Sequence, residues 1–435
     1  MSKYKIINKS IHNLFTSTTF QPRCVFTFVL IMNSKYKRNQ QFNNRQLFFS
    51  YLAQTSDAPI ALEMKKAEGI YITDINDKKY IDGISGFSVN NIGHSHPDVV
   101  KAVQEQAASY MHLIVYGEFI QSPQVAYAKL ITDQLPDSLN CVYFTNSGTE
   151  ATEGAMKLAK RATNRNKIIS FKNAYHGSTQ GSLSIMGDEY WRNAFRPLLP
   201  GIYHEEYNNY KAVAQIDEET ACIIMEVVQA EAGIIPANKE WLQAIRNKCT
   251  ETGTLLVFDE IQSGFGRTGS LWAFEQYNII PDVLLLGKAL GGGMPLGAFI
   301  ASHTLMNKLT DNPVLGHITT FGGHPVSCAA GKAGLEVLLK NNYLSKVKDH
   351  EKILVERIQH PSRKAKRHCG LWMAIEFDSF ETNQQVAKRC IENGLITDWF
   401  LFAPHCLRIA PPLTITTEEL VILCQIVIES IEAKD

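Results

Sequence analysis

Two short apolar runs near the middle of the chain are each followed by a residue that carries charge. Residues 255–258 (LLVF) lead to Asp259, and residues 283–286 (VLLL) are followed, after one glycine, by Lys288. Such runs between polar turns are typical of strands buried on both faces, as in a parallel sheet. The carboxyl ends of parallel strands meet at one edge of the sheet, where ligands bind. The two runs therefore predict an α/β domain that brings one amine and one carboxylate to the same crevice.

Strand and helix signals alternate through the middle of the chain, which predicts a mainly parallel sheet covered by helices. The expected strands are residues 142–144, 168–171, 222–225, 255–258 and 283–286, and the expected helices between them include residues 150–162 and 241–250. After residue 330 the pattern changes to helices at 331–340, 343–358 and 417–432, with strands at 371–377 and 407–413. The alternation in 371–377 predicts a strand buried on one face only. A hairpin over residues 68–82 is expected to join this smaller α+β part.

The chain has 435 residues, which exceeds the usual size of a single domain. We expect a large domain at 91–328, a small domain at 329–435, and an N-terminal segment at 45–90 that joins the small domain. Residues 1–44 are expected to form a disordered extension without a packed position in the core. A targeting segment is the alternative for its first part, and Met32 is a candidate for the true start.

Composition favours small-molecule chemistry over binding to nucleic acid or membranes. The formal net charge is zero, and no basic stripe or polybasic patch stands out in the sequence. The nine cysteines form no C-x-x-C pair, which favours free thiols in a reducing cytoplasm over a disulfide framework. His94, His96 and His176 are too dispersed to predict a metal site.

The pair Asp259 and Lys288 suits an enzyme that binds pyridoxal phosphate. A lysine that is partly desolvated has a lowered pKa and forms an imine with an aldehyde, and an aspartate keeps the pyridine nitrogen protonated. Each residue also has a plain structural interpretation. Asp259 could cap a helix or form a salt bridge, and Lys288 could be a surface lysine.

Four further residues in or after expected strands are candidates for ligand binding, and each again has a structural alternative. Gly148 and Thr149 lie between a strand and a helix, where backbone N–H groups bind phosphate, or where they form an ordinary capped turn. Tyr175 could stack on a planar ring or belong to the core. Arg408, flanked by apolar residues, could clamp a carboxylate or form an interdomain salt bridge.

One glycine motif argues weakly for a dinucleotide-binding oxidoreductase. Residues 264–269 satisfy G-x-G-x-x-G. However, a polar stretch separates them from the preceding strand, and no convincing helix follows, as that fold requires.

Several segments together resemble the class III pyridoxal-phosphate-dependent aminotransferases, the family of ornithine, acetylornithine and 4-aminobutyrate aminotransferases. The similarity covers roughly residues 50–430 and rests on NIGHSHP at 91–97, FTNSGTEA at 144–151, FDEIQSGFGRTG at 258–269, GKALGGG at 287–293 and TFGG at 320–323. It implies the fold-type-I α/β architecture, with a mainly parallel seven-stranded sheet in the large domain and a smaller α+β domain. It also implies pyridoxal 5'-phosphate as the cofactor.

The resemblance implies roles for the residues that surround the cofactor. Lys288 would carry it as an imine and later move the substrate proton, and Asp259 would bind the ring nitrogen. Gln262 would bind the ring hydroxyl, and Tyr175 would stack on the ring. The phosphate would lie against Gly148 and Thr149.

The same resemblance implies a homodimer and a substrate subsite. Thr320 would reach the phosphate bound by the neighbouring subunit. Arg408 would clamp the substrate carboxylate, with Glu226 and Glu231 in the pocket wall.

The sequence departs from the family at several positions. Residues 226–231 read EVVQAE where the family usually has E-P-x-Q-G-E, and His324 stands where an asparagine is usual. Phe87 stands where ornithine-specific relatives have a tyrosine that contacts the substrate amino group. Its missing hydroxyl argues against free ornithine and for a more apolar or acylated side chain.

These observations lead to the hypothesis of an aminotransferase that works by a ping-pong cycle. An amino acid or ω-amino acid would be the donor and a 2-oxo acid, 2-oxoglutarate first, the acceptor. A class III aminomutase and a dialkylglycine-type decarboxylase remain alternatives on the same fold. A non-catalytic binding module is disfavoured because Lys288 and Asp259 are both present.

Overall fold

The computed structural model describes residues 42–116, 118–361 and 363–433, in two units divided between Glu63 and Met64. The first unit contains helix α3 (Asn44–Tyr51), whose N-terminus is closed by a capping box of Asn43 and Gln46. None of the residues of α3 is buried. Of the expected extension at 1–44, residues 1–41 lie outside the described residues.

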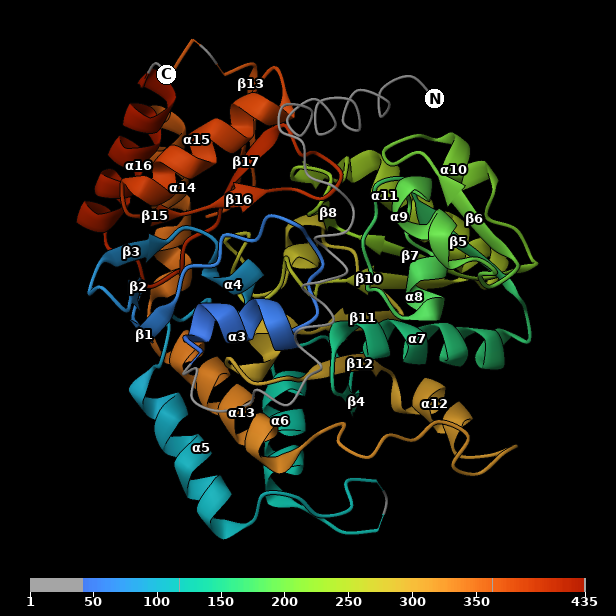
Figure 1. Cartoon of the computed structure of the whole chain (residues 1–435). Coiled ribbons are helices and arrows are strands. Elements are labelled where there is room, and N and C mark those ends of the chain that lie inside the picture. The colour runs from blue at the N-terminus through green and yellow to red at the C-terminus, as the bar shows by residue number, and fades with distance from the viewer. Residues whose placement is uncertain (1–41, 117, 362, 434–435) are drawn as a thin grey trace, which may run out of the picture. The chain divides into compact units, whose positions relative to one another are not determined.

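A seven-stranded sheet is the centre of the second unit (Figure 1). Its strands are β4 (Cys141–Thr145), β5 (Lys167–Phe171), β6 (Ile202–Glu205), β7 (Thr220–Glu226), β10 (Leu255–Asp259), β11 (Val283–Leu286) and β12 (Gly297–Ala301). Their spatial order is β4-β12-β11-β10-β7-β5-β6, and every neighbouring pair is parallel except the two pairs that β12 forms. The predicted fold class, a mainly parallel seven-stranded sheet in an α/β protein, is confirmed.

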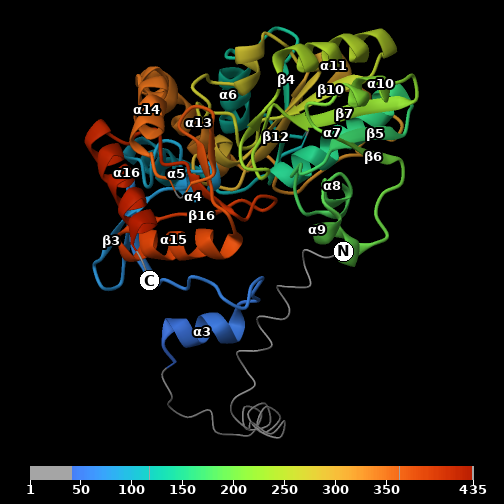
Figure 2. The same ribbon diagram turned by 90° about the horizontal axis from the view of Figure 1, so that it is seen from above.

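Helices cover both faces of this sheet, with α7 (Gly148–Thr163) on one side and α11 (Lys239–Thr252) on the other (Figure 2). Side chains alternate between the two faces along β7. Cys222 and Ile224 belong to the apolar cluster that includes α7, whereas Ile223 and Met225 belong to the cluster that includes α11. Each fully buried aliphatic side chain of this kind contributes about 1.5–3 kcal/mol. Burial on both faces therefore explains why these strands are continuous apolar runs in the sequence.

Two smaller sheets accompany the helices at the C-terminal end of the chain. One has the order β13 (Ala365–His368), β14 (Met373–Glu376), β17 (Cys406–Ile409) and β16 (Asp398–Trp399), and the other has the order β1 (Met64–Glu68), β2 (Tyr71–Asp74), β3 (Lys79–Asp82) and β15 (Leu395–Ile396). The long helices here are α13 (Pro325–Lys340), α14 (Tyr343–Arg357), α15 (Phe380–Glu392) and α16 (Thr417–Glu432). The parallel pairing of β3 with β15 joins Ile81 and Asp82 to the C-terminal part of the chain, and the assignment of the whole segment at 45–90 to the small domain stays a proposal. The division at 91–328 and 329–435 stays a prediction.

One expectation about this region is wrong. The strand around Met373 was expected to be buried on one face, but Met373, Ala374 and Ile375 are all fully buried. Met373 and Ile375 pack in the main core, and Ala374 packs in a separate cluster with Trp372. Apolar groups thus cover both faces of this sheet.

The described residues also contain other α-helices and a two-stranded sheet, besides short 3-10 helices. The helices are α4 (Ser85–Ser88), α5 (Pro97–Ser109), α6 (Ser122–Thr132), α8 (Gln180–Ser184), α9 (Glu189–Arg192), α10 (Lys211–Ala214) and α12 (His303–Met306), and the strands are β8 (Val228–Gln229) and β9 (Ile235–Pro236). The eight cysteines in this part of the chain are free thiols. Among the helices of the described residues, none has the length and apolar character that a membrane span requires.

Candidate active site

Residues that follow β5, β7, β10 and β11, together with the start of α7, surround one cavity of about 310 Å³. This volume lies at the lower end of the range of roughly 300–1,000 Å³ that is usual for small-molecule sites. The cavity is lined by Gly148, Thr149, Tyr175, His176, Gly177, Ser178, Glu226, Glu231, Asp259, Ile261, Gln262, Ser263 and Lys288. Eight of the residues singled out in the sequence are therefore brought together, whereas Phe87, Thr320 and Arg408 do not line the cavity.

Lys288 follows β11 in a left-handed backbone conformation, with a φ of 48°. This conformation is uncommon for lysine and is typical of strained functional positions. Its Nζ donates a 2.8 Å hydrogen bond to Oε1 of Gln262. Burial lowers the pKa of Lys288, and this effect outweighs the opposing charges of Glu231 and Asp259. A lowered pKa increases the fraction of neutral amine, which is the nucleophilic form.

Asp259 ends β10 and has a partner on each carboxylate oxygen. Its Oδ2 lies 2.7 Å from Nδ1 of His176, and its Oδ1 accepts the N–H of Ile261 at 2.9 Å. Burial alone would lower the pKa of His176, but the hydrogen bond and the charge of Asp259 raise it overall. His176 was not predicted as a site residue. Its position directly after Tyr175, in the polar stretch that follows an expected strand, was the available signal.

The start of α7 forms the end of the cavity that suits an anion. Ser147 caps the helix, and the N–H groups of the first helical turn have no partner within the helix. Thr149 Oγ1 lies 2.7 Å from Oγ1 of Thr179, which ties the helix to the loop after Tyr175. Gly177 permits this approach, because a Cβ at this position, where φ is +127°, would lie 2.3 Å from Thr149 Oγ1.

Glu153 and Thr179 were missed by the sequence analysis. Thr179 Oγ1 donates to Oε1 of Glu153 at 2.6 Å, and the N–H groups of Gly181 and Ser182 donate to the same oxygen. Glu153 therefore fixes the loop beside the anion-binding end. A glutamate on a helix face gives no sequence signal of such a role.

Glu226 ends β7 and lies directly across from Asp259 in the sheet. Its two oxygens accept the N–H groups of Tyr175 at 3.2 Å and Ala230 at 2.8 Å. Burial raises the pKa of Glu226 to about 7. This side chain therefore holds two loops of the pocket wall in addition to lining the cavity.

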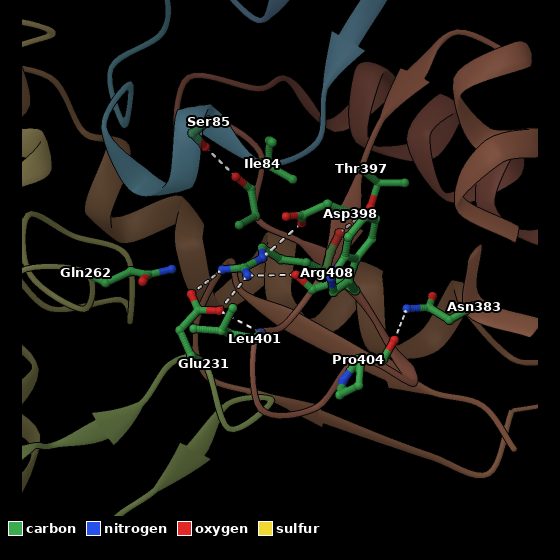
Figure 3. A network of polar contacts seen from close by, with 12 residues as sticks. Ile84, Ser85, Glu231, Gln262, Asn383, Thr397, Asp398, Leu401, Pro404 and Arg408 are labelled. Carbon is green, nitrogen blue, oxygen red and sulfur yellow. Dashed lines mark hydrogen bonds and ion pairs between the residues drawn. The ribbon is translucent and has the colours of Figure 1, made fainter. Parts of the chain in front are cut away.

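Arg408 lies beyond Glu231 and is engaged by it in a bidentate ion pair (Figure 3). Nη1 and Nη2 donate to the two carboxylate oxygens of Glu231, each at 2.9 Å. The charge of Arg408 lowers the pKa of Glu231 although burial opposes it. The ring of Phe87 lies 5.0 Å from the guanidinium carbon, so Phe87 packs against Arg408 rather than lining the cavity. Of the two alternatives that the sequence left open for Arg408, the salt bridge is present, and the carboxylate clamp stays a prediction.

Thr320 is exposed, and its neighbour Thr319 accepts a hydrogen bond from Asn146 Nδ2 at 3.0 Å. Within one chain, Thr320 does not reach the cavity.

The cavity fits pyridoxal phosphate. Three buried polar atoms in its lining, Nε2 of Gln262, Nε2 of His176 and Oγ of Ser263, have no hydrogen-bond partner among the described residues. Leaving such atoms unpaired costs about 1–3 kcal/mol each, so a polar ligand is expected there. The helix end suits a phosphate, and the buried carboxylate of Asp259 suits a protonated ring nitrogen. This topology with this donor set defines a fold-type-I enzyme dependent on pyridoxal phosphate.

Comparisons with known proteins agree with that class. The family Aminotransferase class-III matches residues 51–431. The chain is 36% identical over 368 residues to the acetylornithine aminotransferase of Bacillus anthracis. The aligned region covers 82% of this chain and 92% of that protein. It is 37% identical over 339 residues to the LysW-aminoadipate semialdehyde/glutamate semialdehyde transaminase of Sulfolobus acidocaldarius, with coverage of 77% and 86%. The chain belongs to the class III aminotransferases.

Solved structures agree as well. The ornithine aminotransferase of Toxoplasma gondii superposes with a TM-score of 0.82 at 27% identity, over 95% of this chain and 98% of that one. A transaminase from the marine bacterium Virgibacillus gives a TM-score of 0.83 at 26% identity, over 88% and 97%. One structure of the Toxoplasma gondii enzyme is described as having partial occupancy of pyridoxal phosphate at its active site.

Proposed function

We propose that this enzyme moves an amino group from an amino acid or ω-amino acid, of the acetylornithine or 4-aminobutyrate type, to a 2-oxo acid in a ping-pong cycle. We propose 2-oxoglutarate as the first acceptor to test. The observation that carries the proposal is the buried ion pair of Arg408 with Glu231. Glu231 lines the cavity together with Lys288, and Arg408 lies behind Glu231. A ping-pong enzyme must accept two different substrates in one pocket. An arginine whose partner is a side chain can bind a substrate carboxylate in one half-reaction and remain paired in the other.

Lys288 is proposed as the residue that holds the cofactor and moves the substrate proton. Its pKa is lowered by burial, so the amine can act as a nucleophile and afterwards as a base. Bound pyridoxal phosphate supplies an electron sink for the electron pair that is released when the substrate carbon loses its proton. The hydrogen bond to Gln262 orients Nζ within the cavity.

Asp259, with His176 behind it, is proposed to bind the ring nitrogen and to keep it protonated. The fixed orientation of the carboxylate supports this role, because both of its oxygens already have partners. A negative charge in a buried site favours the protonated form of a neighbouring base.

The remaining cofactor contacts are proposed as follows. Gly148 and Thr149 hold the phosphate at the start of α7, and Tyr175 lies against the ring. Gln262 binds the ring hydroxyl. In support, all four line the same cavity, and Nε2 of Gln262 is a buried donor without a partner among the described residues.

Substrate preference is proposed to depend on Phe87, Glu226 and Glu231. Phe87 has no hydroxyl to bind an amino group and is 43% exposed beside Arg408. This environment favours a donor whose distal end is apolar or acylated over free ornithine.

A homodimer is proposed as the active unit, with Thr320 reaching the partner's cofactor phosphate. In support, exposed apolar side chains are concentrated in residues 111–120 and 314–321, and the rings of His112 and Phe321 lie 4.8 Å apart. They are Met111, Leu113, Ile114, Phe119, Ile120, Val314, Leu315, Ile318 and Phe321, and we call them the apolar face. Large exposed apolar side chains that are concentrated in this way favour an interface with another chain. The free thiols support a further proposal, a cytoplasmic location.

The test is a panel of amino donors and oxo acid acceptors with the purified holoenzyme. N-acetylornithine and 4-aminobutyrate are expected to discharge the imine absorbance, and 2-oxoglutarate is expected to restore it. Ornithine serves as the matched control that differs from N-acetylornithine by one acetyl group. An enzyme that accepts ornithine best, or that prefers pyruvate to 2-oxoglutarate, contradicts the substrate proposal without affecting the family.

A further inference from the structure

The guanidinium of Arg408 has a second carboxylate partner on the side away from the cavity. Its Nε donates to Oδ1 of Asp398 at 3.0 Å (Figure 3). β16 and β17 pair antiparallel, with Asp398 directly opposite Arg408. Thr397 Oγ1 also donates to the backbone carbonyl of Arg408 at 2.5 Å. Asp398 is therefore fixed to Arg408 by the sheet itself.

Glu231 is attached differently. Glu231 follows β8, which forms a two-stranded sheet with β9. It lies 177 positions from Arg408 in the sequence. Glu231 lines the cavity, whereas Asp398 does not. Of the two carboxylates, Glu231 is therefore the one that a ligand entering the cavity meets first.

Other contacts restrict the orientation of the guanidinium. The rings of Phe87 and Phe400 lie 5.0 and 4.3 Å from its central carbon, and Nη2 also donates to the carbonyl of Trp399 at 2.9 Å. Stacked rings oppose tilting of the guanidinium plane. The hydrogen bond from Nε to Asp398 opposes rotation of the guanidinium within its own plane. With Nε held by Asp398, the edge that carries Nη1 and Nη2 points to Glu231.

We propose that Asp398 is a positioning residue of the transamination reaction. By accepting the Nε hydrogen bond, it holds the Nη edge of Arg408 toward the cavity, whether Glu231 or a substrate carboxylate occupies that edge. This inference rests on the proposed function of Arg408 as the carboxylate clamp.

Asp398 has two separable properties, an acceptor oxygen and a charge. Arg408 with two carboxylates has a formal net charge of −1 before a substrate arrives, so the charge of Asp398 opposes entry of a further carboxylate. Asparagine keeps an acceptor oxygen without the charge, and alanine removes both. If orientation is the role of Asp398, the asparagine variant keeps the clamp and the alanine variant loses it.

The experiment measures the dissociation constant of glutarate, an unreactive dicarboxylate, with the wild-type holoenzyme and with the Asp398→Ala and Asp398→Asn variants by calorimetry. Asp398→Ala is expected to bind glutarate about tenfold more weakly, the loss expected when one charged hydrogen bond no longer orients the clamp. Asp398→Asn is expected to bind at least as tightly as the wild type. The inference is overturned if Asp398→Ala binds like the wild type, or if Asp398→Asn binds as weakly as Asp398→Ala.

Two further arms keep the outcome interpretable. If Asp398→Ala does not fold, Asp398→Leu replaces it, because leucine matches asparagine in size and lacks the acceptor. Arg408→Ala tests the clamp itself. Unchanged glutarate binding in Arg408→Ala contradicts the proposed function, whereas loss there with no loss in Asp398→Ala contradicts only the role of Asp398.

Discussion

His176 Nδ1 lies 2.7 Å from Oδ2 of Asp259, and both side chains are buried at the base of the cavity. Because Asp259 Oδ1 is bonded to the backbone of Ile261, the carboxylate cannot rotate without losing one of its partners. The orientation of the group proposed to hold the ring nitrogen is thus set in part by a residue in the loop that follows a different strand, β5.

Removing the imidazole is expected to weaken cofactor binding. His176→Ala leaves Oδ2 of Asp259 without its partner, so the affinity for pyridoxal phosphate is expected to fall roughly 10- to 100-fold, as for the loss of a charged hydrogen bond. The measurement is a fluorescence titration of the apoenzyme. His94→Ala is the control, since it breaks another 2.7 Å contact of a histidine with an aspartate, Asp82, away from the cavity. Equal losses of affinity in both variants would mean that the effect is one of general stability.

Replacing Lys288 is expected to abolish the imine absorbance of the purified enzyme. Lys288→Ala is expected to lower the rate of transamination by roughly 10³-fold or more, because it removes the proposed acid and base. Absorbance spectra and single-turnover kinetics check this expectation. Lys172→Ala, which removes an exposed lysine paired with Glu206, is expected to keep both properties. An imine band that persists in Lys288→Ala would place the attachment at another lysine.

Adding one methyl group to the loop after Tyr175 is expected to disturb the phosphate end of the cavity. In Gly177→Ala the new Cβ would lie 2.3 Å from Thr149 Oγ1, so the loop must move away from the start of α7. A loss of about tenfold or more in cofactor affinity is expected, in line with the loss of one charged contact. Gly253→Ala is a matched control, because Gly253 also has a positive φ, of 68°, but caps α11 away from the cavity. It is expected to lower stability by about 1 kcal/mol without changing cofactor affinity.

The buried carboxyl of Glu226 is expected to make stability depend on pH. Burial raises its pKa from the ordinary value of 4.5 to about 7, so between these values the folded protein holds a proton that the unfolded chain releases. The contribution of this group to the free energy of unfolding is at its maximum below pH 4.5 and decreases as the pH rises toward 7. Glu226→Gln has no carboxyl at this position, so its free energy of unfolding lacks this dependence on pH. The difference in free energy of unfolding between the wild type and Glu226→Gln is therefore expected to change by about 1–3 kcal/mol between pH 4.5 and about 7. Urea unfolding at several pH values measures it, and parallel pH profiles would contradict the burial of a protonated Glu226.

A charge on the apolar face is expected to dissociate the dimer. Ile318 is 60% exposed, and Ile318→Asp is expected to shift sedimentation toward the mass of one chain, 48.8 kDa, because a buried unpaired carboxylate opposes association. Activity is expected to fall as the dimer dissociates, since Thr320 would no longer reach the partner. Ile422→Asp is the control, because Ile422 is 51% exposed on α16 and lies outside the apolar face. A wild-type protein that sediments as a monomer contradicts the proposal directly.

The sequence alone predicted much of the central sheet. Strands β7, β10 and β11 appear as apolar runs because helices cover both faces of the sheet. The helix predicted at 241–250 is observed as α11, which extends from Lys239 to Thr252. β6 and β12 were not predicted. The short run of β12 follows a glycine-rich segment that resembles a loop, and pairing with β4 and β11 makes it a strand. Pairing of this kind depends on segments distant in the sequence, which local pattern does not specify.

Within the site, Asp259 and Lys288 could be placed together from sequence because parallel strands in one sheet end at one edge. The contacts of His176 with Asp259 and of Arg408 with Glu231 required the tertiary structure. The two members of each pair come from segments up to 177 positions apart, and the distance between them is set by how the loops after β5 and β8 lie against β10 and β17. The sequence thus determined which chemical groups are available at the strand ends. Packing of separate elements decided which of those groups touch, because hydrogen bonds act over a few ångströms while residue order does not fix distances on that scale.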